Sequence, residues 1–268
     1  MKTAARYLDS HCHLQARCLT PVIHQVMERA RMAGVTRMLC NGTREEDWQA
    51  VVDLAAMEER VVPFLGIHPW FAETAVDGWE ERLRCLLGKI PAGIGETGLD
   101  KSCRTDFNRQ QEIFLTQLRM ASEMRRPLVI HCVKAWGRLL EILEEHAAAQ
   151  PLPPTMIHSF SGSSETLRRL IRLGCLISFS SRVTTDRKLQ TCFLATPLPS
   201  LLLETDAPGQ PDRKVPPGPS DQKIFSDEPA AITMLYQWAA RMRDMPLHKF
   251  YQEIWRNGEI FTDTILPR

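Results

Sequence analysis

Short runs of apolar and β-branched residues alternate along the chain with longer segments in which apolar residues recur at helical spacing. The short runs predict eight strands, at 6–12, 35–41, 61–67, 92–97, 127–132, 155–159, 174–179 and 200–205. The longer segments predict helices at 21–33, 44–59, 78–88, 106–125, 135–149, 164–173, 187–195 and 228–243. A further helical pattern at 247–261 predicts one extra helix near the end of the chain.

Turn and cap residues support these boundaries. Thr20 before Pro21 is the arrangement of an N-cap followed by proline at the first helical position. Thr43 is followed three residues later by a glutamate, which is a capping-box pattern. Gly34 and Gly174 stand between a helix and the next strand, where a left-handed helix end is needed.

The alternation predicts the α/β class, with a parallel sheet and crossover helices. Eight repeats favour closure into a TIM-like (β/α)8 barrel, and an open doubly wound sheet remains the alternative. No linker-like segment interrupts the pattern, so we expect a single domain over 1–268. The one long irregular stretch, 207–226, follows the last strand, where barrel enzymes place substrate-binding loops.

The charge balance limits the classes of partner. The 33 basic residues nearly cancel the 32 acidic ones, which excludes a strongly basic field for non-specific nucleic-acid binding but leaves a local patch open. The eight cysteines include no C-x-x-C pair, so we interpret them as reduced thiols. We find neither a signal peptide nor a run long enough to span a membrane. We therefore expect a cytoplasmic protein with no membrane partner, and the oligomeric state stays open.

Three polar residues share one face of the first predicted strand. Asp9, His11 and His13 alternate with residues such as Cys12, which the alternation turns to the opposite face. Buried polar groups are costly unless they are satisfied, and two imidazoles two residues apart can chelate one metal ion. A strand exposed at the surface is the other interpretation of this motif.

Further ligand-type residues end other strands. They are Glu96 at the end of the fourth strand, His131 at the end of the fifth, His158 at the end of the sixth, and Asp206 directly after the eighth. The carboxyl ends of barrel strands form the rim where active sites lie. A pair of divalent cations would offset the carboxylate charge and use the imidazole lone pairs. The donor types suit Zn, Mn, Fe or Ni better than an all-oxygen Mg site.

Two other patterns would indicate different chemistry. Gly93, Gly95 and Gly98 match the dinucleotide-binding fingerprint, but that motif needs a helix beginning at its last glycine, and here the helix begins near Asp106. We therefore expect no nucleotide cofactor. A Ser/His/Asp triad stays open, although the chain has no G-x-S-x-G motif. His68 ends the third strand, and we interpret it as a substrate contact, with a structural role as the alternative.

Seven short stretches follow one another in a family-specific order: Asp9-Ser-His-Cys-His13, Gly66-Ile-His-Pro69, Gly95-Glu-Thr-Gly-Leu-Asp100, Arg109-Gln-Gln-Glu112, Ile130-His131, His158-Ser-Phe-Ser-Gly162 and Glu204-Thr-Asp-Ala-Pro208. Through them the chain closely resembles the TatD family of metal-dependent deoxyribonucleases, within the amidohydrolase-like barrels. The resemblance implies a TIM-like barrel, a two-metal site and hydrolysis of phosphodiester bonds in DNA.

The resemblance also implies a ligand assignment. It gives one metal to His11, His13 and Asp206, and the other to His131 and His158, with Glu96 as the bridge. The chain departs from the usual family pattern at three positions, none of them a proposed ligand: Lys101, Val133 and Asp227. Val133 stands where many members carry an arginine that would contact phosphate.

The expected mechanism is in-line attack by a metal-activated water on phosphorus. Glu96 and Asp206 are the expected catalytic residues, with Asp206 as ligand and proton acceptor, and Glu204 is expected to orient the site from outside the ligand set. The small net charge favours a strand end over a long duplex as substrate, with His68 and the basic residues of 207–226 holding phosphates. A hydrolase of a small amide, lactone or phosphate ester is the alternative, and a non-catalytic metal-stabilised interaction protein is a further one.

Overall fold

Eight parallel strands form one sheet at the centre of the computed structural model, which describes residues 5–209 and 228–266. Each strand pairs with the strand that precedes it and the strand that follows it in the sequence. The strands are β1 (Tyr7–Cys12), β2 (Val35–Asn41), β3 (Val61–Leu65), β4 (Gly93–Asp100), β5 (Leu128–Val133), β6 (Thr155–Ile157), β7 (Leu176–Phe179) and β8 (Leu201–Leu203).

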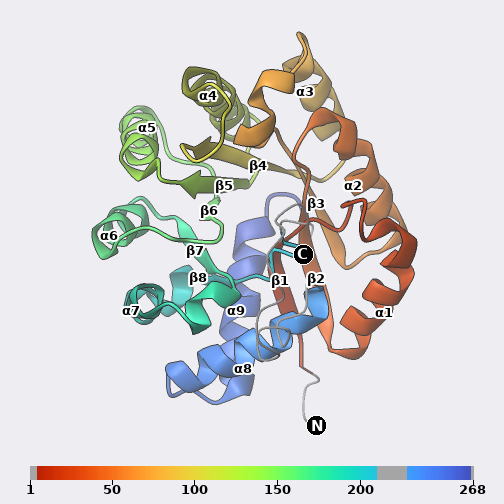
Figure 1. Cartoon of the computed structure of the whole chain (residues 1–268), viewed down its shortest axis with the longest axis vertical. Coiled ribbons are helices and arrows are strands. Elements are labelled where there is room, and N and C mark those ends of the chain that lie inside the picture. Colours follow the sequence, from red (N-terminus) through yellow and green to blue (C-terminus); the bar gives the residue numbers. More distant parts are fainter. Residues whose placement is uncertain (1–4, 210–227, 267–268) are drawn as a thin grey trace.

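The segment after β8 returns to β1 and closes the sheet into a barrel. Cys12 and Ala207 form a parallel bridge, and the backbone N–H of His13 donates to the carbonyl of Ala207 at 2.6 Å. The N–H of Asp206 donates to the carbonyl of His11 at 3.0 Å. Figure 1 shows helices around the outside of the strands. The predicted TIM-like (β/α)8 barrel is confirmed, and the open doubly wound sheet is excluded.

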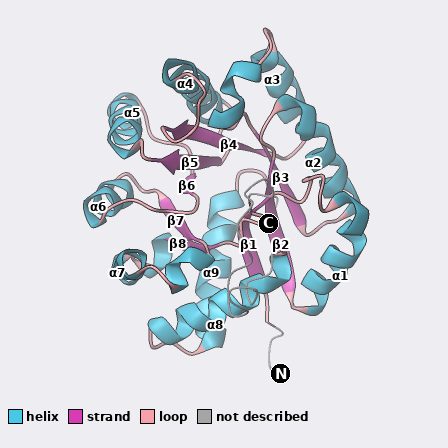
Figure 2. Ribbon diagram, in the orientation of Figure 1, coloured by secondary structure: helices cyan, strands magenta, loops and turns pink. Residues whose placement is uncertain are grey.

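The helices occupy the predicted segments and alternate with the strands, as Figure 2 shows. They are α1 (Ile23–Met32), α2 (Glu45–Met57), α3 (Trp79–Lys89), α4 (Phe107–Glu123), α5 (Trp136–Ala149), α6 (Ser164–Arg172), α7 (Arg187–Ala195), α8 (Ile232–Met242) and α9 (Leu247–Thr262). The last of these is the predicted extra helix. Within 5–209 and 228–266, no helix combines the length and apolar character needed to cross a membrane.

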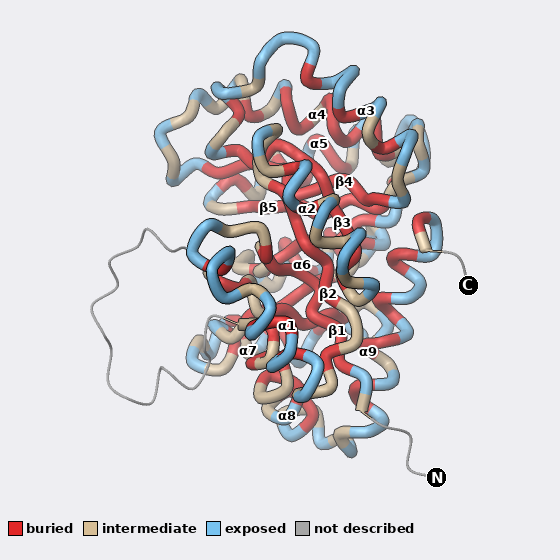
Figure 3. Tube along the Cα trace, turned by 90° about the vertical axis from the view of Figure 1, so that its right-hand side faces the viewer, coloured by how far each residue is buried: buried red, intermediate tan, exposed pale blue. Residues whose placement is uncertain are grey.

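Burial follows the periods of the two element types. In α1 the buried residues are Val26, Met27 and Ala30, spaced as one face of a helix requires. All of β1, β3 and β4 is buried, and Figure 3 shows the strands as the buried centre of the molecule. The polar side chains of β1 and β4 therefore lie in an environment where each needs a partner.

Both predicted helix caps are wrong in detail. Thr20 lies inside a 3₁₀ turn, Thr20–Val22, and its side chain caps nothing. Before α2 the hydroxyl and the N–H of Thr43 donate to Asp47 at 2.7 and 3.0 Å, instead of pairing with Glu46. The reason is that α2 begins at Glu45, which places Asp47 third in the helix and turns Glu46 to solvent. Gly34 and Gly174 have the predicted left-handed backbone, with φ of 84° and 80°.

Only the start of the irregular stretch 207–226 falls within the described residues. Its basic residues, and Asp227, lie outside them.

Candidate metal centre

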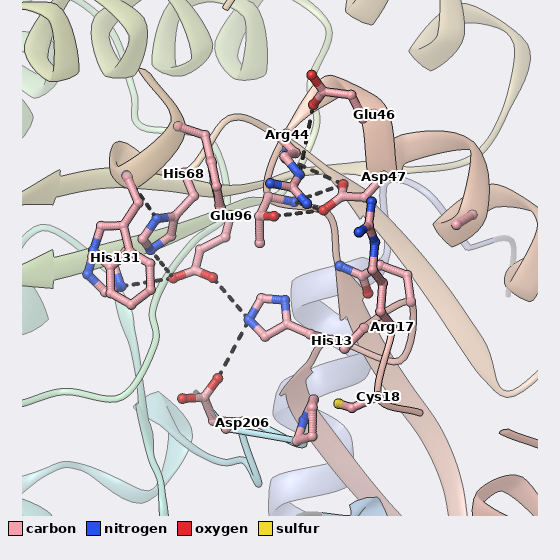
Figure 4. A pocket seen from close by; sticks show the side chains of 18 of the residues that line it. His13, Arg17, Cys18, Arg44, Glu46, Asp47, His68, Glu96, His131 and Asp206 are labelled. Atoms are coloured by element: carbon pink, nitrogen blue, oxygen red, sulfur yellow. Dashed lines mark hydrogen bonds and ion pairs between the residues drawn. The ribbon is translucent and has the colours of Figure 1, made fainter. Parts of the chain in front are cut away.

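An open pocket of about 750 Å³ lies at the carboxyl ends of the strands. Figure 4 shows side chains from several strand ends pointing into it. Its polar lining includes predicted site residues at the ends of six strands, namely His13, His68, Glu96, His131, His158 and Asp206. The structure places these side chains around one pocket, at the strand ends where the sequence predicts them.

Glu96 lies at the centre of the cluster, and each of its carboxylate oxygens faces a different pair of histidines. Its Oε2 is 3.3 Å from Nε2 of His11 and 3.2 Å from Nε2 of His13. Its Oε1 is 2.9 Å from Nδ1 of His131 and 2.8 Å from Nε2 of His158. The cluster therefore divides into two groups that share one carboxylate.

Asp206 joins the first group from the segment that follows β8. Its Oδ1 is 3.7 Å from Nε2 of His11 and 3.6 Å from Nε2 of His13. Its φ of 58° lies in the left-handed region, which aspartate tolerates better than most residues. Asp9 supports this turn from β1 by accepting from the N–H of Thr205 at 2.9 Å. The side chain of Asp206 is 31% exposed and so stays open to the pocket.

Hydrogen bonds on the far side of three imidazoles determine which ring nitrogen carries the proton. Nδ1 of His13 lies 2.7 Å from the carbonyl of Asn41, which can only accept. Nδ1 of His158 lies 3.2 Å from Oε1 of Glu204, and Nε2 of His131 lies 3.3 Å from Oδ2 of Asp100. In the neutral rings the opposite nitrogens therefore direct lone pairs into the cluster.

In the neutral rings these nitrogens face one another across the cluster. Nδ1 of His131 and Nε2 of His158 are 3.1 Å apart, and Nε2 of His11 and Nε2 of His13 are also 3.1 Å apart. Two lone pairs repel at this distance, so each group needs a proton or a metal ion to hold its nitrogens and carboxylates together. Nitrogen and carboxylate donors whose outer nitrogens are held by acceptors fit a divalent metal ion.

The electrostatics of the cluster favour positive charge as well. Burial alone would lower the pKa of His13, but the hydrogen bond to Glu96 and the charges of Glu96 and Asp206 outweigh it and raise that pKa to about 9. Burial opposes ionisation of Glu96, yet the surrounding histidines, His158 first, hold its pKa well below its usual range. The carboxylate of Glu96 is thus charged and attracts a cation.

His68 behaves differently from the other histidines. It is close enough to Glu96 and His131 to form a third candidate ligand group. However, its Nδ1 accepts from the N–H of Trp70 at 3.1 Å, so the proton of the neutral ring lies on Nε2, 3.3 Å from Oε1 of Glu96. Burial lowers the pKa of His68 to about 4, which keeps the ring neutral. It presents an N–H to the site, as a substrate contact would.

The family model described as TatD related DNase matches residues 8–262. The chain belongs to this family. It is 33% identical to the metal-dependent hydrolase YjjV of Escherichia coli K12 over 213 residues, which cover 77% of this chain and 81% of YjjV. It is 32% identical to the 3'-5' ssDNA/RNA exonuclease TatD of Yersinia pseudotuberculosis over 226 residues, covering 82% and 85% of the two chains.

Solved structures agree with this membership. The crystal structure of the E. coli TatD homologue YjjV aligns with a TM-score of 0.85 and 29% identity, and the alignment covers 97% of this chain and 98% of YjjV. The chain is therefore a TatD-family member, and the proposed ligand residues lie together in its candidate metal centre.

The glycine motif of this TatD-family chain lies within β4 and allows close packing. β4 continues through Gly98, where the dinucleotide fingerprint would require a helix to begin. Gly98 has a φ of 143°, and a Cβ there would overlap the backbone carbonyl of His131. The missing side chain lets β4 and β5 approach closely, which brings His131 to Glu96.

Three features of the site were not predicted from the sequence. Asp100 orients His131, and strand alternation from Glu96 through position 98 could have identified it. The acceptor for His13 is the backbone carbonyl of Asn41, which no side-chain pattern reveals. Cys18 lines the pocket, although no thiol was expected there. Cys12, as predicted, turns away, with Sγ 3.6 Å from the carbonyl of Leu39.

Proposed function

We propose that this chain is a divalent-metal-dependent nuclease that hydrolyses phosphodiester bonds of DNA and prefers single-stranded ends. The observation that carries the proposal is the convergence of imidazole lone pairs on the two oxygens of Glu96. The names of its relatives support nucleic acid as the substrate class. The small net charge favours a short footprint at a strand end.

In this proposal two ions share the site. His11, His13 and Asp206 would hold one ion, His131 and His158 would hold the other, and Glu96 would be a ligand shared by both groups. Zn, Mn, Fe and Ni suit the nitrogen-rich donor set better than Mg. When bound, such ions lower the pKa of water and stabilise the charge that develops on the phosphate oxygens.

The protein's own residues position the substrate and accept the proton. Asp206 faces the open pocket, so its carboxylate is placed to take a proton from the attacking water. The Nε2–H of His68 suits a hydrogen bond to a phosphate oxygen. Glu204 and Asp100 keep His158 and His131 in the tautomers that the site requires.

The test is cleavage of end-labelled oligonucleotides, single-stranded and duplex, DNA and RNA, with Mn, Zn or Mg added to the metal-depleted protein. We expect cleavage of single-stranded DNA that requires metal and is faster than cleavage of the duplex. A panel of small lactones, amides and phosphate esters is assayed in parallel. Turnover of one of these without cleavage of any oligonucleotide would replace the proposal with the small-molecule alternative.

Glu204→Gln should weaken metal binding without preventing it. Oε1 of Glu204 accepts from the N–H of Ser159 at 2.7 Å and is 3.2 Å from Nδ1 of His158. An amide is a weaker acceptor, and loss of such a supporting carboxylate typically costs about 10- to 100-fold in metal affinity. Competition with a chromophoric chelator measures the change. Glu123→Gln, on the exposed side of α4, is the matched control, and equal affinities in the two variants would contradict the role of Glu204.

A further inference from the structure

We propose that Trp70 and Arg44 form a nucleotide-binding subsite beside the metal centre. Trp70 stacks on the base next to the scissile phosphate, and Arg44 binds the neighbouring phosphate of the same strand. This inference deepens the proposed nuclease function and rests on it. Three features of the pocket support it: an exposed aromatic ring that is held in place, arginine side chains whose charges are weakly paired or unpaired, and the placement of these groups around Glu96.

Trp70 is an exposed aromatic side chain that is held in place. It is 39% exposed, and among residues 5–209 and 228–266 it is the only aromatic among the exposed large hydrophobic residues. Its Nε1–H donates to Oδ2 of Asp100 at 2.7 Å, and its ring stands edge-on to His68 with centroids 5.0 Å apart. A ring fixed this way offers a stacking surface at little cost in conformational entropy.

The position of Trp70 relative to the reacting centre fits a nucleotide. His68 separates Trp70 from Glu96, with the Nε2 of His68 3.3 Å from Oε1 of Glu96. Trp70 therefore lies beside the metal centre, within reach of a base that adjoins a phosphate bound there. Stacking uses the π-face that every base has, so this contact tolerates any sequence.

Arg44 supplies a cation at the same pocket. Its guanidinium lies 4.6 Å from the centroid of the Phe71 ring, which fixes its position. Its ion-pair partner Glu46 is 3.9 Å away on a side chain that is 67% exposed, so the pair is weak. The carboxylate of Asp47 already accepts a hydrogen bond from the hydroxyl of Thr43 at 2.7 Å.

Arg17 adds a second charge to this side of the pocket. It lines the pocket from the loop after β1, and within the described part of the chain no ion pair neutralises it. Figure 4 shows Arg44 and Asp206 on opposite sides of Glu96. A strand end can therefore place one phosphate at Glu96 and the next at Arg44. In a duplex the bases are paired and stacked on each other, so Trp70 favours single strands.

The first test removes the base and the aromatic ring separately. Oligonucleotides that lack the base on either side of the scissile bond are compared with the intact strand, using wild type, Trp70→Phe and Trp70→Leu. Both substitutions remove the hydrogen bond to Asp100, but only phenylalanine keeps an aromatic face. For each protein, kcat/KM for the strand that lacks a base is divided by kcat/KM for the intact strand. A general loss of activity or of metal affects both values equally and cancels in this ratio.

For wild type and Trp70→Phe we expect loss of one of these bases to lower kcat/KM by about 5- to 100-fold, the range that stacking of one base produces. For Trp70→Leu we expect a change of less than about twofold, because the stacking surface is already gone. An equal penalty for the missing base in wild type and Trp70→Leu would overturn the subsite while leaving the nuclease function intact. If the wild-type protein cleaves no oligonucleotide, both the subsite and the proposed nuclease function are refuted.

The second test concerns Arg44 and uses the salt dependence of KM. Each phosphate contact contributes about 0.7 to the slope of log KM against log salt for a single strand. We expect Arg44→Gln to lower the slope by about this amount. The control, Arg256→Gln, removes the same charge from the exposed side of α9 and should leave the slope unchanged. Equal slopes in the two variants would show that Arg44 does not bind phosphate.

Discussion

Glu96→Gln is expected to remove most bound metal and to lower kcat/KM by about 10³-fold or more. The carboxylate faces both pairs of histidines, through Oε2 at 3.2 Å from Nε2 of His13 and Oε1 at 2.8 Å from Nε2 of His158. A glutamine cannot offer two anionic oxygens, and its NH₂ group would face imidazole lone pairs on one side. Loss of metal-ion stabilisation costs several kcal/mol, and about 4 kcal/mol corresponds to 10³-fold in rate.

Metal analysis after equilibration with Mn or Zn, alongside oligonucleotide cleavage, measures both effects. Glu112→Gln removes a carboxylate from α4, where it pairs at the surface with Arg109, and should retain metal and activity. Circular dichroism confirms that both variants are folded. Full metal content in Glu96→Gln would refute the shared-carboxylate arrangement.

Asp206→Asn is expected to lower kcat by about 10²- to 10⁴-fold, the range for loss of a general base. Its effect on metal content should be smaller than that of Glu96→Gln, because His11, His13 and Glu96 remain in the same group. Asparagine has the same shape and tolerates a φ of 58°, so the turn after β8 should persist. The effect should therefore appear in the chemical step.

The two roles of Asp206 can be separated by adding excess metal. If the carboxylate were only a ligand, saturating Mn would restore the kcat of Asp206→Asn. We expect kcat to stay low at saturating metal, because the proton acceptor is missing. Recovery to within a fewfold of wild type would remove Asp206 from the proton-transfer step and leave it as a ligand alone.

The sequence by itself determined the order of elements and the identity of the rim residues. Strand alternation placed His11 and His13 on one face, and strand-end positions marked His131 and His158, because parallel strands bring their carboxyl ends to one rim. Helix ends were predictable where a single residue decides them, as at Gly34. These signals are local, so they can be read without knowing the fold.

Closure of the barrel and the chemistry of each imidazole were decided only by the tertiary structure. Closure depends on contacts such as Thr205 to Asp9, which are 196 residues apart in the chain. The tautomer of His13 depends on the backbone carbonyl of Asn41 in the neighbouring strand β2. The exposed ring of Trp70 is held by a hydrogen bond to Asp100 in β4. Side-chain patterns carry no information on such partners, because they become neighbours only when the strands pair and the barrel closes.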